Sequence, residues 1–268
     1  MNNRDLAIRY FQGLTTEEVG RLLPEDLVLL GYRGSIAHGC HIANTDPNSI
    51  DDIDVMGVFV GSPNHYLGLK QKDHHEVFIG AYDAVSYELR KFVTLLVGAN
   101  PNVLGLLWLK YEHYIYRGDI GNMLIANRNM FVSQKIFYSF TGYAHAQLNR
   151  MERFATNGYM GEKRKKLVEK YGYDCKNAAH LIRLLRMGIE FLKEGELHVF
   201  RDDAAELLEI KRGEWTIERV KAEAEKLFRE AEVAHEACTL PHHPDVDKIN
   251  DLLVNMLSSH FGVRFHGQ

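Results

Sequence analysis

Two aspartates, Asp52 and Asp54, stand at the start of an apolar run that ends at Val60. In an extended strand, side chains at i and i+2 project from the same face, so the two carboxylates would lie side by side. Mg²⁺ prefers oxygen ligands and usually takes one or two carboxylates from a protein. The pair therefore indicates a site for a hard divalent cation. The preceding Asp51 falls on the opposite face by the same period of two, and we exclude it from the expected site.

A glycine and a serine, Gly34 and Ser35, follow the apolar run from Leu27 to Leu30. A strand that leads into such a turn can bring backbone amides and a hydroxyl close to a phosphate, because glycine permits close approach of the backbone. Together with Asp52 and Asp54, the turn predicts metal-assisted nucleotidyl transfer. In that chemistry, positioning and neutralisation of charge do most of the work.

A third acid is expected, because this chemistry often uses two metal ions about 3.5–4 Å apart. Asp83 is favoured, since it lies within the otherwise mostly apolar run from Val77 to Tyr87. Glu76 and Glu88 are rival acids, and the sequence leaves the choice among the three open.

Several local sequences resemble the DNA polymerase beta-type nucleotidyltransferase superfamily. Within it they are similar to a group of predicted nucleotidyltransferases associated with RNA repair in bacteria and phages. The segments that carry the resemblance are Gly34-Ser35 with Gly39, and residues 52–58, 66–68, 87–92, 100–102 and 180–185. The resemblance covers roughly the first 110 residues and reaches the later half through the His180 segment.

The resemblance implies that Gly34 and Ser35 bind a triphosphate and that Asp52 and Asp54 bind metal, and it favours Asp83 as the third acid. The implied reaction moves a nucleoside monophosphate from an NTP to an acceptor hydroxyl, with Mg²⁺ or Mn²⁺ as cofactor. An RNA end is the favoured acceptor. A protein side chain or a small molecule is the alternative acceptor, and a non-catalytic nucleotide-binding module is the alternative function.

The apolar spacing predicts an α/β (α+β) fold, in which a small mixed sheet with flanking helices precedes a mostly helical part. The expected strands are residues 27–32, 52–60 and 77–87, and the expected helices are 5–23, 88–97, 103–109, 131–149, 177–192 and 216–237. Residues 33–48 are rich in Gly, Ser, Asn, Asp and Pro and are expected to form a loop. We expect a nucleotidyltransferase domain over residues 1–125 and a helical domain over residues 126–268.

Two groups of polar residues in the later half carry charge. Lys176, His180 and Arg183 are spaced at i, i+4 and i+7, so they share one helix face. They either close over the nucleotide or form a surface stripe beside acidic neighbours. The segment from Glu162 to Lys176 has a local net charge of +3, which suits either contact with nucleic-acid phosphates or a solvated helix face.

A histidine-rich loop lies between the Gly-Ser pair and Asp52. His38, Cys40 and His41, with His74 and His75 further on, could be drawn as a zinc site. Their spacing is irregular, and soft ligands compete poorly for a magnesium role. A polar loop near the phosphates is the favoured interpretation.

The composition is that of an ordinary globular protein, with 46% hydrophobic and 25% charged residues in 268. A formal charge of -4 excludes a global basic field, so any contact with nucleic acid must use a local patch. The cysteines Cys40, Cys175 and Cys238 form no disulfide pattern, and neither a signal pattern nor a membrane-spanning run is expected. These features favour the cytoplasm. The sequence does not indicate the base of the NTP or the oligomeric state.

Overall fold

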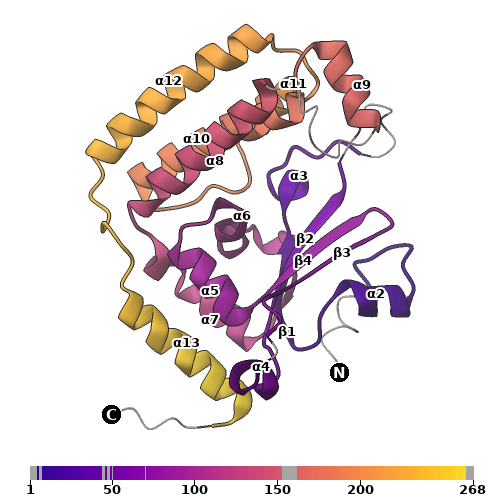
Figure 1. Ribbon diagram of the computed structural model, residues 1–268, viewed down its shortest axis with the longest axis vertical. Coiled ribbons are helices and arrows are strands. Elements are labelled where there is room, and N and C mark those ends of the chain that lie inside the picture. The colour runs from indigo at the N-terminus through magenta and orange to yellow at the C-terminus, as the bar shows by residue number, and fades with distance from the viewer. Residues whose placement is uncertain are drawn as a thin grey trace.

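The computed structural model describes Asp5, residues 8–43, Asp46, Ser49, and residues 51–69, 71–152 and 162–263. A five-stranded mixed sheet with flanking helices occupies one half of the molecule, and long helices pack together in the other half (Figure 1). The expected α+β fold class is confirmed.

The sheet has the strand order β3-β4-β2-β1-β5. Its strands are β1 (Leu27–Tyr32), β2 (Ile53–Phe59), β3 (His74–Ile79), β4 (Tyr82–Glu88) and β5 (Tyr114–Arg117). Strands β2 and β4 are parallel, and the other neighbouring pairs are antiparallel. The two central strands β1 and β2 are almost wholly buried, as their near-continuous apolar sequences require.

The single strand expected over residues 77–87 is wrong, because this segment belongs to the β3–β4 hairpin. The turn falls at Gly80 and Ala81, where Gly80 takes a positive φ of 62°. Apolar residues continue on both sides of the turn and hide it in the sequence. As a result, Asp83 lies near the start of β4 and pairs with Asp54 of β2 in the parallel register.

Three other expected elements differ near the N-terminal half. Of the helix expected over residues 5–23, Asp5 and Ile8 are helical, residues 9–13 form turns, and α2 (Thr16–Leu22) begins at a capping box between Thr15 and Glu18. The helix expected over residues 103–109 is a short α6 (Pro101–Leu104) followed by the 3₁₀ helix η1 (Gly105–Trp108). In its described residues, the expected loop contains one helical turn, α3 (Gly34–Ala37).

The remaining helices surround the sheet and form the later half. They are α4 (Pro63–Leu67), α5 (Leu89–Val97), α7 (Asp119–Ala126), α8 (Lys135–Glu152), α9 (Glu162–Tyr171), α10 (Cys175–Glu194), α11 (Ala204–Lys211), α12 (Ile217–Glu236) and α13 (Val246–Phe261), with 3₁₀ turns η2 (Tyr111–His113) and η3 (Arg128–Phe131). Helices α5, α8, α10 and α12 match expected helices with shifted ends. Helix α10 is central and packs against α8, α11 and α12.

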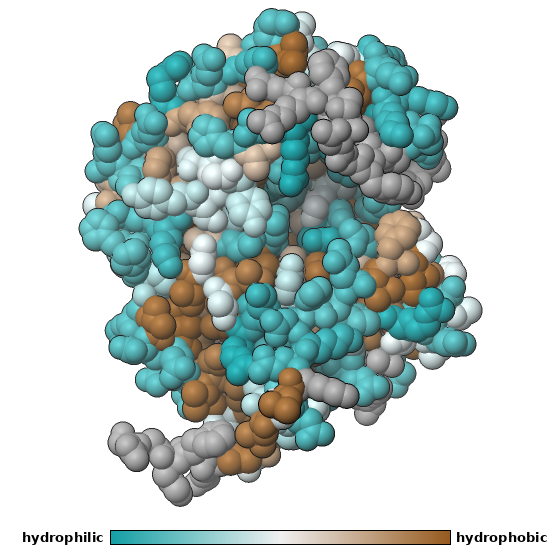
Figure 2. All heavy atoms as spheres, in the orientation of Figure 1, coloured by the Kyte–Doolittle hydropathy of each residue, from teal (hydrophilic) through white to brown (hydrophobic). Residues whose placement is uncertain are grey.

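The two faces of the sheet pack into different hydrophobic clusters. One face contributes Met56 and Val85 to a large cluster that runs through α10 and reaches Met256 of α13. The other face packs against Leu22 and the N-terminal segment. Hydrophobic residues also reach the surface where α13 lies across α5 and α7 (Figure 2). Because one cluster spans both halves, the division at residues 125 and 126 stays a prediction.

The far end of β4 is fixed by a buried polar group, Glu88. Its carboxylate accepts a hydrogen bond from the Tyr66 hydroxyl, and a second from the backbone amide of Lys91 at 3.2 Å, which caps α5. His65 Nε2 lies 3.7 Å from the same carboxylate. Glu88 therefore stabilises the fold at the opposite end of β4 from Asp83.

Within the described part of the chain, no helix combines the length and apolar character needed to cross a membrane.

Candidate active site

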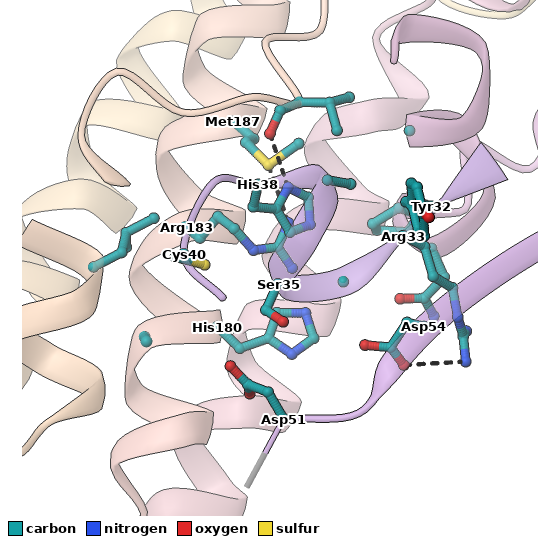
Figure 3. Close-up of a pocket in the computed structure, with 18 of the residues that line it drawn as sticks. Tyr32, Arg33, Ser35, His38, Cys40, Asp51, Asp54, His180, Arg183 and Met187 are labelled. Atoms are coloured by element: carbon teal, nitrogen blue, oxygen red, sulfur yellow. Dashed lines mark hydrogen bonds and ion pairs between the residues drawn. The ribbon is translucent and has the colours of Figure 1, made fainter. Parts of the chain in front are cut away.

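A cavity of about 270 Å³ lies between the start of β2 and the helices α10 and α11 (Figure 3). Its walls include all five residues that were expected to bind the nucleotide, namely Gly34, Ser35, Lys176, His180 and Arg183. They also include Arg33, Asp51, Asp54 and Lys211. The structure thus brings the Gly-Ser turn, one expected metal ligand and the α10 stripe around one cavity.

Asp54 and Asp83 lie side by side on neighbouring strands. The Arg33 guanidinium lies between them, with its Nη2 atom 3.1 Å from Asp83 Oδ2 and 3.7 Å from Asp54 Oδ1. Asp52 directly precedes β2. Of the rival acids, Glu76 is exposed on β3, and Glu88 is buried at the other end of β4. Asp83 is therefore the one of these three acids that lies beside Asp54.

The environment of Asp54 disfavours its charge. Burial raises the pKa of Asp54 to about 6, although Arg33 and Lys176 act to lower it. The charges of Asp83 and Asp52 raise this pKa further. Negative charge therefore gathers at the start of β2 and β4, although within the described ranges no group of three or more acids, histidines or cysteines is arranged to hold a metal ion.

Gly34 is required by its surroundings. It has a positive φ of 60°, and a Cβ atom at this position would overlap Asp54 Oδ2. A larger residue would therefore both strain the backbone and displace the carboxylate. The glycine turn and the acid are thus one geometric unit.

The histidine loop connects the Gly-Ser turn to the helical half. Ser35 Oγ lies in hydrogen-bond contact with His41 Nδ1 at 3.0 Å. His38 Nδ1 contacts the Val199 carbonyl oxygen at 2.8 Å, and the backbone amide of Arg201 donates to the His38 carbonyl at 3.3 Å. These contacts position α3 against the connection between α10 and α11.

Asp51, which the sequence analysis left out of the expected metal pair, lines the same cavity as Asp54. Asp51 and Asp52 both precede β2, so the alternation of a strand determines the direction of neither side chain. Its buried carboxylate accepts hydrogen bonds from the Lys211 ammonium group and, at 2.9 Å, from the Ile42 amide. Lys211 also donates to the Cys40 carbonyl at 2.9 Å. This ion pair therefore holds the segment before β2 against α11.

The α10 stripe faces the cavity. Arg183 donates a hydrogen bond to Met187 Sδ at 3.1 Å, and no carboxylate of the described ranges forms an ion pair with it. Burial lowers the pKa of Arg183 to about 10. Burial also lowers the pKa of His180 well below its ordinary value, and Arg183, Arg150, Lys176 and Arg164 lower it further. Lys176 Nζ lies 3.8 Å from Asp51 Oδ1 and is paired with it. Of the two cations of the stripe, Arg183 is therefore the one without a carboxylate partner among the described residues, and it lies beside a neutral histidine.

Residues 16–255 match the model of the RNA repair pathway DNA polymerase beta family, RlaP. The chain belongs to this family. No curated protein matches the chain. The expected resemblance is therefore confirmed, and the general activity that membership supports is nucleotidyl transfer.

In this RNA repair pathway family member, Asp54 and Asp83 offer donors of the kind that suits the divalent metal that such enzymes generally use. Their donors are hard carboxylate oxygens, and the Arg33 cation already lies between two of them. Sequence reasoning did not identify Arg33 or Lys211. Arg33 could have been recognised as a cation directly before the Gly-Ser pair. Lys211 pairs with Asp51 across 160 residues, and no nearby sequence pattern indicates this contact.

Proposed function

We propose that this chain catalyses metal-dependent transfer of a nucleoside monophosphate from an NTP to an acceptor hydroxyl, releasing pyrophosphate. The observation that carries the proposal is the division of charge across one cavity. Asp54, with Asp83 beside it, lies on the sheet side, and Lys176 and Arg183 lie on the α10 side. A triphosphate with its metal would suit the space between the two walls, because the metal is attracted to the acids and the phosphates are attracted to the cations.

Each residue has a distinct role in this proposal. Asp52, Asp54 and Asp83 would hold Mg²⁺ or Mn²⁺, which supplies neutralisation of the triphosphate and activation of the attacking hydroxyl when bound. Gly34 and Ser35 would present an amide and a hydroxyl to the phosphates. On the other wall, Lys176 and Arg183 contribute positive charge, and His180 contributes a ring nitrogen, Nε2, that is buried and has no hydrogen-bond partner among the described residues.

Asp83 would also orient the acceptor hydroxyl or accept its proton. It is about a third exposed, with 30% of its side chain accessible, so an acceptor can reach it. Its place beside Asp54 would put this step next to the metal ligands.

The direct test is the double substitution Asp52→Ala with Asp54→Ala, assayed for pyrophosphate release from each NTP. We expect turnover to fall by on the order of 10³-fold or more, because the metal loses two of its three ligands. Glu76→Ala is the matched control, since it removes an exposed acid from β3. Intact turnover in the double variant would show that the mechanism is wrong.

We propose an RNA end as the acceptor, and helix α9 supports it. This helix has no buried residue, and it exposes Lys163, Lys165, Lys166 and Lys170. A partly buried ion pair nevertheless fixes it, because Arg164 Nη2 donates to Asp174 at 2.7 Å and Asp174 caps the start of α10. A solvated basic helix is thus held next to the helix that carries Lys176. Such a surface suits a phosphate backbone.

The acceptor is tested by incubating the protein with labelled NTPs and with RNA, protein or small-molecule fractions. Label on RNA is expected. Label on protein or on a small molecule would replace RNA as the acceptor, and NTP binding without any product would favour a non-catalytic module.

The role of α9 is tested by the triple substitution Lys163→Gln, Lys166→Gln and Lys170→Gln. We expect weaker binding of single-stranded RNA and a shallower dependence of log affinity on log salt, by roughly one unit for each lost phosphate contact. The control is a triple variant at Lys193, Lys226 and Lys248, which are exposed on α10, α12 and α13. Equal effects of the two variants would count against a specific role for α9.

Two further proposals concern organisation and location. We propose that residues 1–125 form the nucleotidyltransferase domain and residues 126–268 a helical domain, although their cores are continuous. We propose a cytoplasmic location, since Cys40, Cys175 and Cys238 are free thiols. Limited proteolysis and fractionation of cells test these proposals.

A further inference from the structure

We propose that Arg33 is an internal counter-cation that competes with the divalent metal for Asp54 and Asp83, and that an NTP relieves this competition. The inference rests on the proposed function, because it takes these acids as the metal ligands. It assigns a role to a residue that the sequence motifs did not include.

The position of Arg33 is set by its backbone. Its amide donates to the Asp54 carbonyl at 2.9 Å, which fixes the residue beside β2 immediately before Gly34. From there its guanidinium reaches both acids, at 3.1 Å from Asp83 and 3.7 Å from Asp54. One cation is therefore shared by two carboxylates on neighbouring strands.

The competition follows from the oxygens that the two cations need. The carboxylates of Asp54 and Asp83 repel each other, and either a guanidinium or a divalent metal can offset that repulsion. Both use the same oxygen atoms, so the metal must displace the Arg33 contacts. Arg33 is 28% exposed, and ion pairs that contact water are weak enough to be exchanged.

The same side chain can move toward a triphosphate. Arg33 lines the cavity together with Ser35 and Lys176, so phosphate oxygens bound there would offer it new partners. Its Nε atom is buried and has no hydrogen-bond partner in the described ranges, so this N–H group is available to donate to a phosphate oxygen. Withdrawal of Arg33 toward phosphate would leave the acids to the metal. Nucleotide and metal would then strengthen each other's binding by the same factor, as linkage requires.

The test measures Mn²⁺ binding to the full chain by electron paramagnetic resonance, without nucleotide. We expect Arg33→Met to bind Mn²⁺ about 10-fold more tightly than the unsubstituted protein, within the usual range for coupled sites. Arg33→Lys keeps the charge and should bind nearly as weakly as the unsubstituted protein. Arg90→Met is the matched control: it removes a cation that lies over the Tyr66 ring, and it should leave Mn²⁺ affinity unchanged.

A second measurement adds a saturating non-hydrolysable NTP analogue. The gain in Mn²⁺ affinity should be larger in the unsubstituted protein than in Arg33→Met, because that variant has no competition to relieve. Unchanged or weaker Mn²⁺ binding by a folded Arg33→Met variant would overturn the inference, as would equal gains on adding the analogue.

The double variant Asp54→Asn with Asp83→Asn separates this outcome from failure of the proposed function. If it binds Mn²⁺ as tightly as the unsubstituted protein, the proposed metal site is wrong and the inference falls with it. If it loses Mn²⁺ while Arg33→Met shows no change, the metal site stands and only the role of Arg33 is refuted.

Discussion

Two arginines on neighbouring turns of α10 have opposite environments. Arg186 donates hydrogen bonds to Asp203 at 2.7 Å, to Glu206 at 2.8 Å and to Glu223 at 3.2 Å. Although burial opposes its charge, these bonds raise the pKa of Arg186 above its ordinary value. Arg183 faces the cavity, where the Met187 sulfur is its one acceptor in the part of the chain that the structure describes, and burial lowers its pKa. Pairing, rather than burial alone, separates a cation that stabilises the fold from one that is available to a ligand.

The largest effect is expected for Lys211→Met, which tests whether pairing matters more than location. Lys211 lies in the cavity wall but is paired with Asp51, and their side chains are 6% and 1% exposed. Its loss would leave the buried Asp51 carboxylate with only a more distant cation, Lys176 at 3.8 Å, at a cost of about 3–4 kcal/mol in the free energy of unfolding. Urea denaturation measures this change. Adding Asp51→Asn should recover most of the loss, and no recovery would argue against the ion pair as its source.

The next largest effect is expected for Arg186→Met, which should lower the free energy of unfolding by about 3 kcal/mol, because three acids would lose their shared cation. The NTP affinity of the folded protein should not change, since Arg186 is absent from the cavity wall. Urea denaturation and equilibrium nucleotide binding measure the two quantities. A fall in NTP affinity without a fall in stability would reverse the comparison.

Arg183→Met should give the converse result. We expect NTP affinity to fall by about 10- to 100-fold, the range of one or two charge-assisted hydrogen bonds, with stability unchanged or increased. Fluorescence titration with a labelled NTP measures the affinity. Arg183→Lys should retain part of the NTP affinity that Arg183→Met loses. If Arg183→Met instead loses stability and keeps its NTP affinity, Arg183 is a structural residue.

The smallest effect is expected for Asp54→Asn, which tests the acid side of the cavity. The pKa of Asp54 is raised from its ordinary value of 3.8 to about 6, so the cost of its charge builds up between these two values and is complete above pH 6. Asparagine carries no such charge. The variant should therefore gain about 1 kcal/mol at pH 8 and almost nothing below about pH 4, after allowance for partial exposure. Thermal melts on either side of this window measure the gain, and a larger gain at the acidic end would contradict the sign of the shift.

The sequence predicted the residues whose positions depend on local rules. Gly34 and Ser35 follow a strand, and Lys176, His180 and Arg183 share a helix face, so short-range spacing was sufficient to group them. The placement of Asp83 beside Asp54 was also expected, although for an incomplete reason. The strand expected to carry Asp83 did not include the turn at Gly80. The β3–β4 hairpin, with that turn, explains how β4 runs parallel to β2.

The missing residues depend on contacts between distant segments. Asp51 was excluded by strand alternation, yet its partner is Lys211 on α11. Nor does any local pattern distinguish Arg183 from Arg186, because the acids that pair Arg186 come from α11, α12 and the segment before α11. Sequence spacing gives the face of a helix, whereas the partners of that face come from tertiary structure.

The polar group around Glu88 has a consequence for the chemistry at the other end of its strand. Glu88 lies five positions after Asp83, a span of about 17 Å along β4. A slip of one residue would turn Asp83 away from Asp54, since alternate side chains project from opposite faces. Tyr66 and the first turn of α5 resist that slip by anchoring Glu88. Substitutions at Tyr66 or Glu88 can therefore silence the enzyme from a distance, and a screen for inactive variants should recover them although they contact no substrate.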